Sequence, residues 1–246
     1  MSRVETRLAI ITGAARGIGA ATALRLAKEG FTVLAADLED GAELQGVVAE
    51  MTAAGGNGLA VAGDVADPGL FPALFDRAES LCGGVDVLVN NAGIMVRKPI
   101  AEIDDMEFDR QIAVNLRGTF HGLREASQRM RKGGRIVSVS SSVAALRAEN
   151  YGIYAATKVG IEAMTASLAK ELRGRDITVN AVAPGATGTD LFLNGKSAEA
   201  IAAFARLAPL NRIGSPEEIA AVIAFITGPE GGWINGQTIH ANGGVV

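Results

Sequence analysis

The sequence has one cysteine, no cluster of lysine and arginine, and no apolar run that approaches the length of a membrane span. Cys82 cannot form a disulfide within the chain, and no spacing of histidine and cysteine is typical of a metal site. We therefore expect a reducing compartment and no metal. A membrane helix needs about 20 apolar residues, and the apolar stretch near the N-terminus is too short for a signal peptide. A cytoplasmic protein without membrane contact is expected.

The charge balance excludes a further class of partner. The 246 residues include 23 lysines and arginines against 27 aspartates and glutamates, a formal net charge of −4. Binding to a phosphate backbone requires a basic patch, so nucleic acid is not an expected partner. With 48% apolar and 20% charged residues, the composition is that of an ordinary globular protein that can build a full-sized core.

Short apolar segments alternate along the chain with longer segments of helical period, such as those near 17–29 and 41–54. This alternation is typical of repeated β-α-β units, and strands that are apolar at nearly every position belong to a sheet covered on both faces. We expect an α/β fold, a doubly wound Rossmann-like parallel sheet with helices on both faces, in a single domain over 1–246. Seven strand candidates lie at 8–12, 31–37, 59–65, 85–93, 135–141, 177–185 and 237–244.

The least regular part of the chain is 186–215, where three glycines, Asn194 and Pro209 interrupt a weak helical pattern. Two interpretations stay open: a mobile lid over a substrate site, or a long connection. A lid at this place would determine much of the specificity.

A glycine-rich stretch, TGAARGIG, follows the first strand and opens the first helix. Gly13, Gly17 and Gly19 lack Cβ atoms, which allows a tight turn and lets a pyrophosphate approach the N–H groups at the helix start. The spacing is G-x-x-x-G-x-G rather than the general G-x-G-x-x-G, so the position between strand and helix is the stronger signal. We predict a dinucleotide site at this turn, which also includes Ile18.

Two charged residues bear on which dinucleotide binds. Asp37 ends the second strand, where an acidic residue meets the ribose hydroxyls of NAD; the alternative is a helix-capping aspartate. Arg16 in the turn could pair with the 2′-phosphate of NADP, or be solvated. Because a phosphate beside the Asp37 carboxylate is a costly like-charge contact, NAD(H) is favoured, and NADP(H) stays open through Arg16.

Tyr154 and Lys158 lie four residues apart in the helical segment YAATK, so their side chains share one face. A lysine ammonium near a phenol lowers the phenol pKa, which is ordinarily about 10. Such a tyrosine can exchange a proton with the oxygen of a carbonyl or alcohol while a hydride moves at the carbon. Taken alone, residues at this spacing are mostly surface or packing residues.

Tyr154 and Lys158 belong to a series of motifs that occur in a fixed order along the chain. TGAARGIG, NNAG at 90–93, Asn115, a serine before the tyrosine, YAATK and PG at 184–185 occur in the order typical of the short-chain dehydrogenase/reductase family. The chain resembles this family over nearly its whole length. The resemblance implies a nicotinamide cofactor and a mechanism with an Asn–Ser–Tyr–Lys set.

The resemblance assigns a role to each of four catalytic residues. Tyr154 would be the acid/base, and Lys158 would lower its pKa and hold the nicotinamide ribose. Ser141 would hydrogen-bond the substrate oxygen, although a slip in register would promote a neighbouring serine. Asn115 would position a water in a proton relay.

The same resemblance assigns the cofactor site. Asp64 would accept a hydrogen bond from the adenine amine with Val65 beside it, unless Asp64 is an ordinary turn residue. Thr187 stands where the family normally has an apolar residue, which puts the local loop geometry in doubt. The remaining cofactor residues would be Asn91, Ala92, Gly93, Tyr154, Lys158, Pro184, Gly185, Thr187 and Thr189.

Substrate and assembly are less specified. By nearness to the catalytic positions, the pocket residues would be Met95, Ala144, Tyr151 and Phe192, with packing as the alternative role. The helical patterns at 107–131 and 154–173 resemble those through which family members pair, so a homotetramer is expected by analogy.

The segments 211–220 and 234–244 are similar to the β-ketoacyl-acyl-carrier-protein reductase branch. Our first hypothesis is an NAD(H)-dependent oxidoreductase for a small-molecule secondary alcohol or ketone. The alternatives are an NADPH-dependent 3-ketoacyl thioester reductase, a non-catalytic dinucleotide-binding sensor, and an epimerase or lyase, whose relatives usually carry an added C-terminal domain. A carrier-protein partner would need a basic surface, for which the candidates are Arg124, Arg129, Arg131 and Lys132.

Overall fold

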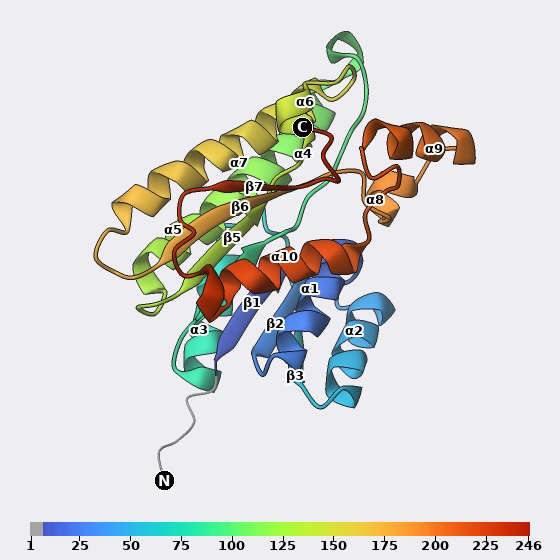
Figure 1. Ribbon diagram of the computed structural model, residues 1–246. Coiled ribbons are helices and arrows are strands. Elements are labelled where there is room, and N and C mark those ends of the chain that lie inside the picture. The colour runs from blue at the N-terminus through green and yellow to red at the C-terminus, as the bar shows by residue number, and fades with distance from the viewer. Residues whose placement is uncertain (1–6) are drawn as a thin grey trace.

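Seven parallel strands form one sheet at the centre of the protein (Figure 1). The computed structural model describes residues 7–246. The strands lie in the order β3-β2-β1-β4-β5-β6-β7, so the direction of winding reverses between β1 and β4. Their bounds are β1 Leu8–Thr12, β2 Thr32–Asp37, β3 Asn57–Ala62, β4 Val87–Asn90, β5 Arg135–Val139, β6 Thr178–Pro184 and β7 Thr238–Ala241.

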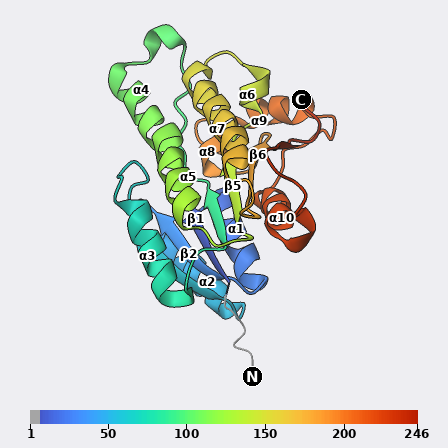
Figure 2. The same ribbon diagram turned by 90° about the vertical axis from the view of Figure 1, so that its left-hand side faces the viewer.

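Helices cover both faces of the sheet. One face carries α1, α2 and α10, and the other carries α3, α5 and α7 (Figure 2). The α-helices are α1 Gly17–Lys28, α2 Ala42–Ala53, α3 Leu70–Cys82, α4 Asp105–Gln111, α5 Gly118–Arg129, α6 Val143–Leu146, α7 Gly152–Glu171, α8 Asp190–Leu193, α9 Ala198–Leu207 and α10 Pro216–Thr227. Shorter elements are the 3-10 turns η1 Ile100–Glu102 and η3 Pro229–Gly231, and the π-helical turn η2 Ile112–Arg117.

Alternate residues of each central strand enter two separate cores. In β1, Leu8 and Ile10 belong to the core beneath α3, α5 and α7, whereas Ala9 and Ile11 belong to the core beneath α1, α2 and α10. Every residue of β1 is buried. A strand covered on both faces needs apolar residues throughout, which explains the uninterrupted apolar run in the sequence.

The predicted doubly wound α/β fold is confirmed, but the five strands β3 to β7 end earlier than predicted, and β3, β4 and β7 do so by three residues each. β3 covers Asn57–Ala62 instead of 59–65, and β4 covers Val87–Asn90 instead of 85–93. The residues after each strand leave the sheet at its carboxyl edge, where open α/β sheets bind ligands near the reversal of strand order. The over-extended part of each predicted strand therefore falls on loops that line the site.

The long helix expected at 107–131 is interrupted. It consists of α4, the π-helical turn η2 and α5, with the predicted catalytic Asn115 inside η2. A π-helical turn adds one residue to the helical ring and occurs mostly at functional sites. The irregular segment 186–215 contains α8 and α9 (Figure 1); that it moves as a lid stays a prediction.

Two alanine substitutions test the geometry of the glycine turn. A Cβ at Gly19 would lie 1.9 Å from the carbonyl oxygen of Gly13, whereas Gly46, exposed in α2, has no atom within 4 Å of the added carbon. We expect Gly19→Ala to lower the free energy of unfolding by about 1–3 kcal/mol or more. Gly46→Ala should raise it by up to about 1 kcal/mol through helix propensity. Thermal unfolding measures both, and equal melting temperatures for the two variants would contradict the crowding.

Candidate active site

The glycine turn at the end of β1 is tied to the end of β4 by side chains. The Asn91 amide donates to the carbonyl oxygens of Thr12 (2.9 Å) and Gly13 (3.0 Å). The buried Thr12 hydroxyl accepts from the backbone N–H groups of Asn91 and Ala92, each at 3.1 Å. Gly13 has φ +65°, a value that favours glycine. These bonds hold the two strand ends where the winding reverses.

A cleft of about 230 Å³ lies above this junction, and we call it the nucleotide cleft. Eleven predicted cofactor residues line it: Gly13, Arg16, Gly17, Ile18, Asp37, Asp64, Val65, Asn91, Ala92, Gly93 and Thr189. Gly19 lies behind the lining and allows the close turn. Sequence reasoning missed the other lining residues, which are Ala36, Leu38, Gly63, Ile94, Arg110, Val114, Asp190 and Leu191.

Asp37 is fixed in the nucleotide cleft by backbone hydrogen bonds. Its carboxylate accepts from the N–H of Ala15 in the glycine turn and from the N–H of Leu38, both at 2.8 Å. The carboxylate therefore caps the turn rather than the following helix. Arg16, predicted to be free or to meet a phosphate, instead donates to Glu43 at 3.1 Å, and both side chains are largely exposed.

Asp64 is engaged by the protein itself. Its carboxylate accepts from the guanidinium of Arg110 at 2.8 Å and from the N–H of Ala66 at 2.9 Å. Partial burial alone would raise the pKa of Asp64, but the Ala66 and Arg110 hydrogen bonds hold it below the usual value. An adenine amine would share this carboxylate with Arg110, which the predicted role did not include.

Tyr154 and Lys158 are buried side by side on α7. The Lys158 ammonium lies 5.5 Å from the centre of the Tyr154 ring and donates to the carbonyl oxygen of Val139 at 2.7 Å. Burial lowers the pKa of Lys158 to about 8, although nearby Glu162 acts to raise it.

The expected lowering of the Tyr154 pKa is wrong for the protein alone. Burial raises the pKa of this phenol to about 12, because the negative phenolate loses hydration. The hydrogen bond with Ser141 acts in the opposite direction, and Tyr151 raises the pKa slightly further. The phenol is therefore a proton donor at neutral pH.

The structure separates the four neighbouring serines. Ser138 accepts from the Asn90 amide at 3.3 Å, and Ser140 donates to Glu162 at 2.6 Å. Ser142 donates to a backbone carbonyl and accepts from Asn242. Ser141 accepts from the N–H of Val143 at 3.3 Å, and it is the one of these four serines that lowers the pKa of Tyr154. The register with Ser141 is thus the one that brings a serine hydroxyl to the phenol.

Asn115 lies fully buried in η2, with its amide engaged on both sides. Its oxygen accepts from the Ile94 N–H at 2.8 Å, and its nitrogen donates to the Ile94 carbonyl at 2.9 Å and to Thr157 at 3.3 Å. A Cβ at Gly93 would lie 3.4 Å from the Asn115 oxygen and 3.7 Å from the Lys158 ammonium. The missing side chain at Gly93 therefore keeps space open over the catalytic pair.

A second cavity of about 280 Å³, the catalytic cavity, opens over Ser141 and Tyr154. The predicted residues that line it are Met95, Ser141, Tyr151, Tyr154, Lys158, Pro184, Gly185, Thr187, Thr189 and Phe192. Ala144 is a correction: it is buried, and Val143 and Leu146 of the same short helix face the cavity instead. Sequence reasoning missed Phe204, Leu207, Asn242 and Val245, which reach the cavity from distant parts of the chain.

The nucleotide cleft and the catalytic cavity are continuous. Both are lined by Ile18, Asn91, Gly93, Thr189 and Leu191. An elongated dinucleotide fits this arrangement, since its adenosine end would meet Asp37 and its nicotinamide end would lie beside Tyr154. The space without a Cβ at Gly93 lies between the two ends. The residues present therefore fit a nicotinamide dinucleotide.

Two further searches cover residues 7–246. Within that range no group of three or more His, Cys, Asp or Glu side chains could hold a metal ion. None of the helices described there is long and apolar enough to cross a bilayer.

Known proteins share both the sequence and the fold. A family model described as enoyl-(acyl carrier protein) reductase matches residues 13–246. A short-chain type dehydrogenase/reductase of Picea abies is 40% identical, with 98% of this chain and 92% of that protein covered. A 3-oxoacyl-[acyl-carrier-protein] reductase of Staphylococcus aureus is 38% identical over 98% of each. A short chain dehydrogenase from Burkholderia cenocepacia, solved in complex with NADP, has a TM-score of 0.92 and 36% identity, with 99% of each chain covered.

These similarities extend over nearly the whole chain, and they agree with the parallel sheet and with the motifs that line the two cavities. The chain belongs to the short-chain dehydrogenase/reductase family, whose members are NAD(P)-dependent oxidoreductases of CH–OH and C=O groups.

Proposed function

We propose that this protein transfers a hydride between NAD(H) and a secondary alcohol or ketone, with Tyr154 as the acid/base. The observation that carries the proposal is that the buried Tyr154 and Lys158 and the half-buried Ser141 line the catalytic cavity, which is continuous with the nucleotide cleft. When bound there, a nicotinamide ring supplies or accepts the hydride. The mostly apolar walls of the catalytic cavity suit a small organic substrate.

The protein side of ketone reduction follows from the geometry. The Tyr154 phenol donates its proton to the carbonyl oxygen, and the Ser141 hydroxyl holds the same oxygen by a hydrogen bond. The Lys158 ammonium, fixed by the Val139 carbonyl, stabilises the phenolate that remains. Asn115 fixes the Ile94 backbone beside this cluster. In alcohol oxidation the proton moves in the opposite direction.

The NAD(H) preference rests on how Asp37 is held. Two backbone N–H groups fix its carboxylate in the cleft, so the charge cannot rotate away from a 2′-phosphate. Arg16, the residue that could pair with that phosphate, already contacts Glu43. A related structure is a complex with NADP, and NADP(H) is therefore the alternative that the experiment must exclude.

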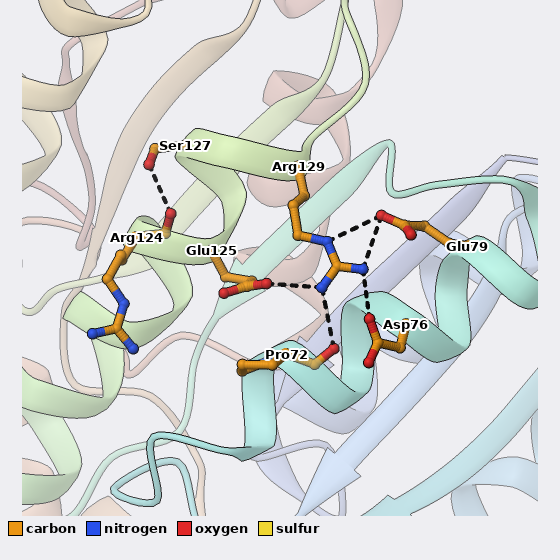
Figure 3. Close-up of polar contacts among 7 residues, drawn as sticks. All are labelled: Pro72, Asp76, Glu79, Arg124, Glu125, Ser127 and Arg129. Carbon is orange, nitrogen blue, oxygen red and sulfur yellow. Dashed lines mark hydrogen bonds and ion pairs between the residues drawn. The ribbon is translucent and has the colours of Figure 1, made fainter.

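A carrier-protein thioester is disfavoured by the contacts of Arg129, one of the basic residues on α5 and in the loop after it. The guanidinium of Arg129 lies between three carboxylates, those of Asp76, Glu79 and Glu125, at 2.7–2.9 Å (Figure 3). These hydrogen bonds, that of Glu125 first, raise the pKa of Arg129. Its charge is already matched within the chain.

The other arginines of that group are also engaged. Arg131 pairs with Asp86 at 2.8 Å, and the Arg124 guanidinium lies 5.3 Å from the Phe120 ring centre. Of the four candidates, Arg129 and Arg131 are paired with carboxylates, whereas Arg124 and the exposed Lys132 make no ion pair within residues 7–246, so an acidic carrier protein would find two unmatched positive charges here. The 3-ketoacyl thioester reductase therefore stays the second candidate, supported by the similarity to the Staphylococcus aureus enzyme.

Several predictions about the whole protein accompany the proposal. The homotetramer stays a prediction by analogy, consistent with exposed Phe108 and Phe120 on α4 and α5 and Val159 on α7. A cytoplasmic location, a single domain over 1–246 and a substrate lid at 186–215 also stay predictions. A sensor without chemistry is the opposing hypothesis, and the Tyr154 experiment below separates it from an enzyme.

Asp37→Asn tests the cofactor choice. The amide removes the negative charge while its oxygen can still accept from Ala15, so we expect the ratio of NADH to NADPH affinity to fall by about tenfold or more, which is about 1.4 kcal/mol. Nicotinamide fluorescence titrations at fixed salt measure both affinities. Asp40→Asn is the control, because Asp40 bonds to Gln45 and is not among the cleft-lining residues. Tighter binding of NADPH by the unaltered protein would overturn the assignment.

Tyr154→Phe tests the chemistry. Removal of the hydroxyl takes away the proton that the substrate oxygen needs, so turnover should fall by about 10²-fold or more while NADH affinity changes little. Steady-state rates on a panel of ketones and alcohols, with the fluorescence titration above, measure the two quantities. Full activity in the variant would remove Tyr154 from the mechanism, and inactivity of the unaltered protein on every substrate would favour the sensor.

The pH dependence follows from the buried phenol. Reduction needs the protonated phenol, and with a pKa raised to about 12 this form persists across neutral pH, so kcat/KM for reduction should be flat between pH 6 and 8. Oxidation needs the phenolate, whose fraction grows about tenfold per pH unit below the pKa. Oxidation should therefore rise over the same range, most steeply below pH 7, because Lys158, with a pKa of about 8, has lost about half of its charge at pH 8. Initial rates in both directions provide the test, and an oxidation rate that falls with pH would contradict it.

A further inference from the structure

Two positive side chains flank the catalytic cavity: each contacts an aromatic residue that lines it, and neither lines the cavity itself. Arg97, in the loop after β4, donates to the Tyr151 hydroxyl at 3.5 Å, and its guanidinium lies 5.9 Å from the Tyr151 ring centre. Lys196, between α8 and α9, donates to the Phe192 carbonyl and lies 4.4 Å from the Phe192 ring centre. Tyr151 and Phe192 both line the cavity. Each cation therefore sits next to one of its aromatic walls.

The two cations lack the ion pairs that neighbouring cations make. Lys98 pairs with Glu107, and Arg212, which lines the cavity, pairs with Glu218 through two short contacts. For Arg97 and Lys196, no carboxylate of residues 7–246 lies within 4.0 Å. They are also close enough to act on each other: burial first, and then the charge of Arg97, lower the pKa of Lys196. Like charges without a counter-charge destabilise each other, and an anion between them would remove that repulsion.

Apolar and aromatic side chains of the catalytic cavity lie between these two cations and the Tyr154 phenol. The rings of Tyr154 and Tyr151 lie 6.5 Å apart, and Arg97 lies beyond Tyr151. The same cavity is lined by the apolar side chains of Met95, Leu146 and Phe204, and the Phe204 ring packs against Phe192 at 5.2 Å. A ligand that reached from the phenol to the cations would therefore have a polar reacting end, an apolar middle and a charged far end.

We propose that Arg97 and Lys196 form a carboxylate-binding subsite, so that the substrate is a ketone or secondary alcohol with an apolar spacer and a terminal carboxylate. This inference rests on the proposed function and names its substrate class. A carboxylate suits a guanidinium as a bidentate partner, and a single negative charge loses less hydration beside aromatic walls than a doubly charged phosphate. Because Lys196 belongs to the segment 186–215 and Arg97 to the sheet edge, a bound carboxylate would also join the proposed lid to the rest of the protein.

The test uses methyl keto acids, CH3–CO–(CH2)n–COO⁻ with n from 2 to 6, and their methyl esters. Initial rates with the preferred dinucleotide give kcat/KM for each acid and its ester. At the chain length that spans the cavity, we expect the acid to be preferred by about tenfold or more, mainly through KM. Added salt should reduce this preference, because screening weakens exposed charge attraction. An ester equal to or better than its acid at every length would overturn the subsite.

Variants that each remove one positive charge show which residues cause the preference for the acid over its ester. Arg97→Gln and Lys196→Gln should each lower the ratio of acid to ester kcat/KM by about tenfold. Lys98→Gln is the matched control: it removes the adjacent charge, which Glu107 already pairs, and should leave the ratio unchanged. An equal loss for acid and ester in the first two variants, or the same loss of ratio in the control, would contradict the assignment.

A binding measurement separates this inference from the proposed function. If no ketone is turned over, the proposed function fails, and calorimetric titration of the keto acid series into the protein with dinucleotide decides the subsite. Binding of the acid that Arg97→Gln weakens about tenfold would support the subsite without turnover. Absence of binding, or binding insensitive to both variants, would overturn it. Turnover of esters and acids at equal kcat/KM would support the proposed function and contradict only the carboxylate subsite.

Discussion

The hydrogen bonds between the end of β1 and the end of β4 are the constraint on which the rest of the site depends. Asn91 and the Thr12 hydroxyl join the two strands on either side of the reversal in winding. This junction forms the floor of the nucleotide cleft and, through Asn91 and Gly93, part of the catalytic cavity. Because the carbonyl of Gly13 is held there, the turn cannot widen without the loss of buried hydrogen bonds, whose donors would remain unpaired.

The catalytic side chains lie in an environment where burial outweighs local charge. Sequence spacing alone placed Lys158 next to Tyr154 and led to the expectation of a lowered phenol pKa. In the protein the ammonium is directed to the Val139 carbonyl, and both groups lose hydration. Desolvation favours the neutral form of each. Before any ligand binds, the Tyr154 phenol therefore keeps its proton, and the Lys158 ammonium loses its proton more readily than an exposed lysine does.

Much of the architecture could be predicted because it follows from local patterns. Apolar runs fixed the seven strands, and the glycine turn, NNAG and YAATK placed the cofactor and catalytic residues that line the two cavities. The predicted roles of single residues were less accurate where contacts between residues far apart in the sequence determine how a side chain is placed. Asp64 pairs with Arg110, which is 46 residues away, and Ala144 is buried because its helical turn directs Val143 and Leu146 outward. No period or motif in the sequence encodes such pairings.

The position of Asp37 has a consequence for how a protein of this kind can change over evolutionary time. Its carboxylate both lines the nucleotide cleft and supplies the acceptor for the Ala15 N–H in the glycine turn. A mutation to alanine or glycine at this place would change ligand selectivity and at the same time weaken the loop that both ligands need. Asparagine keeps an acceptor without the charge, so it is the intermediate through which a lineage can pass from one dinucleotide to the other while each ancestor remains folded.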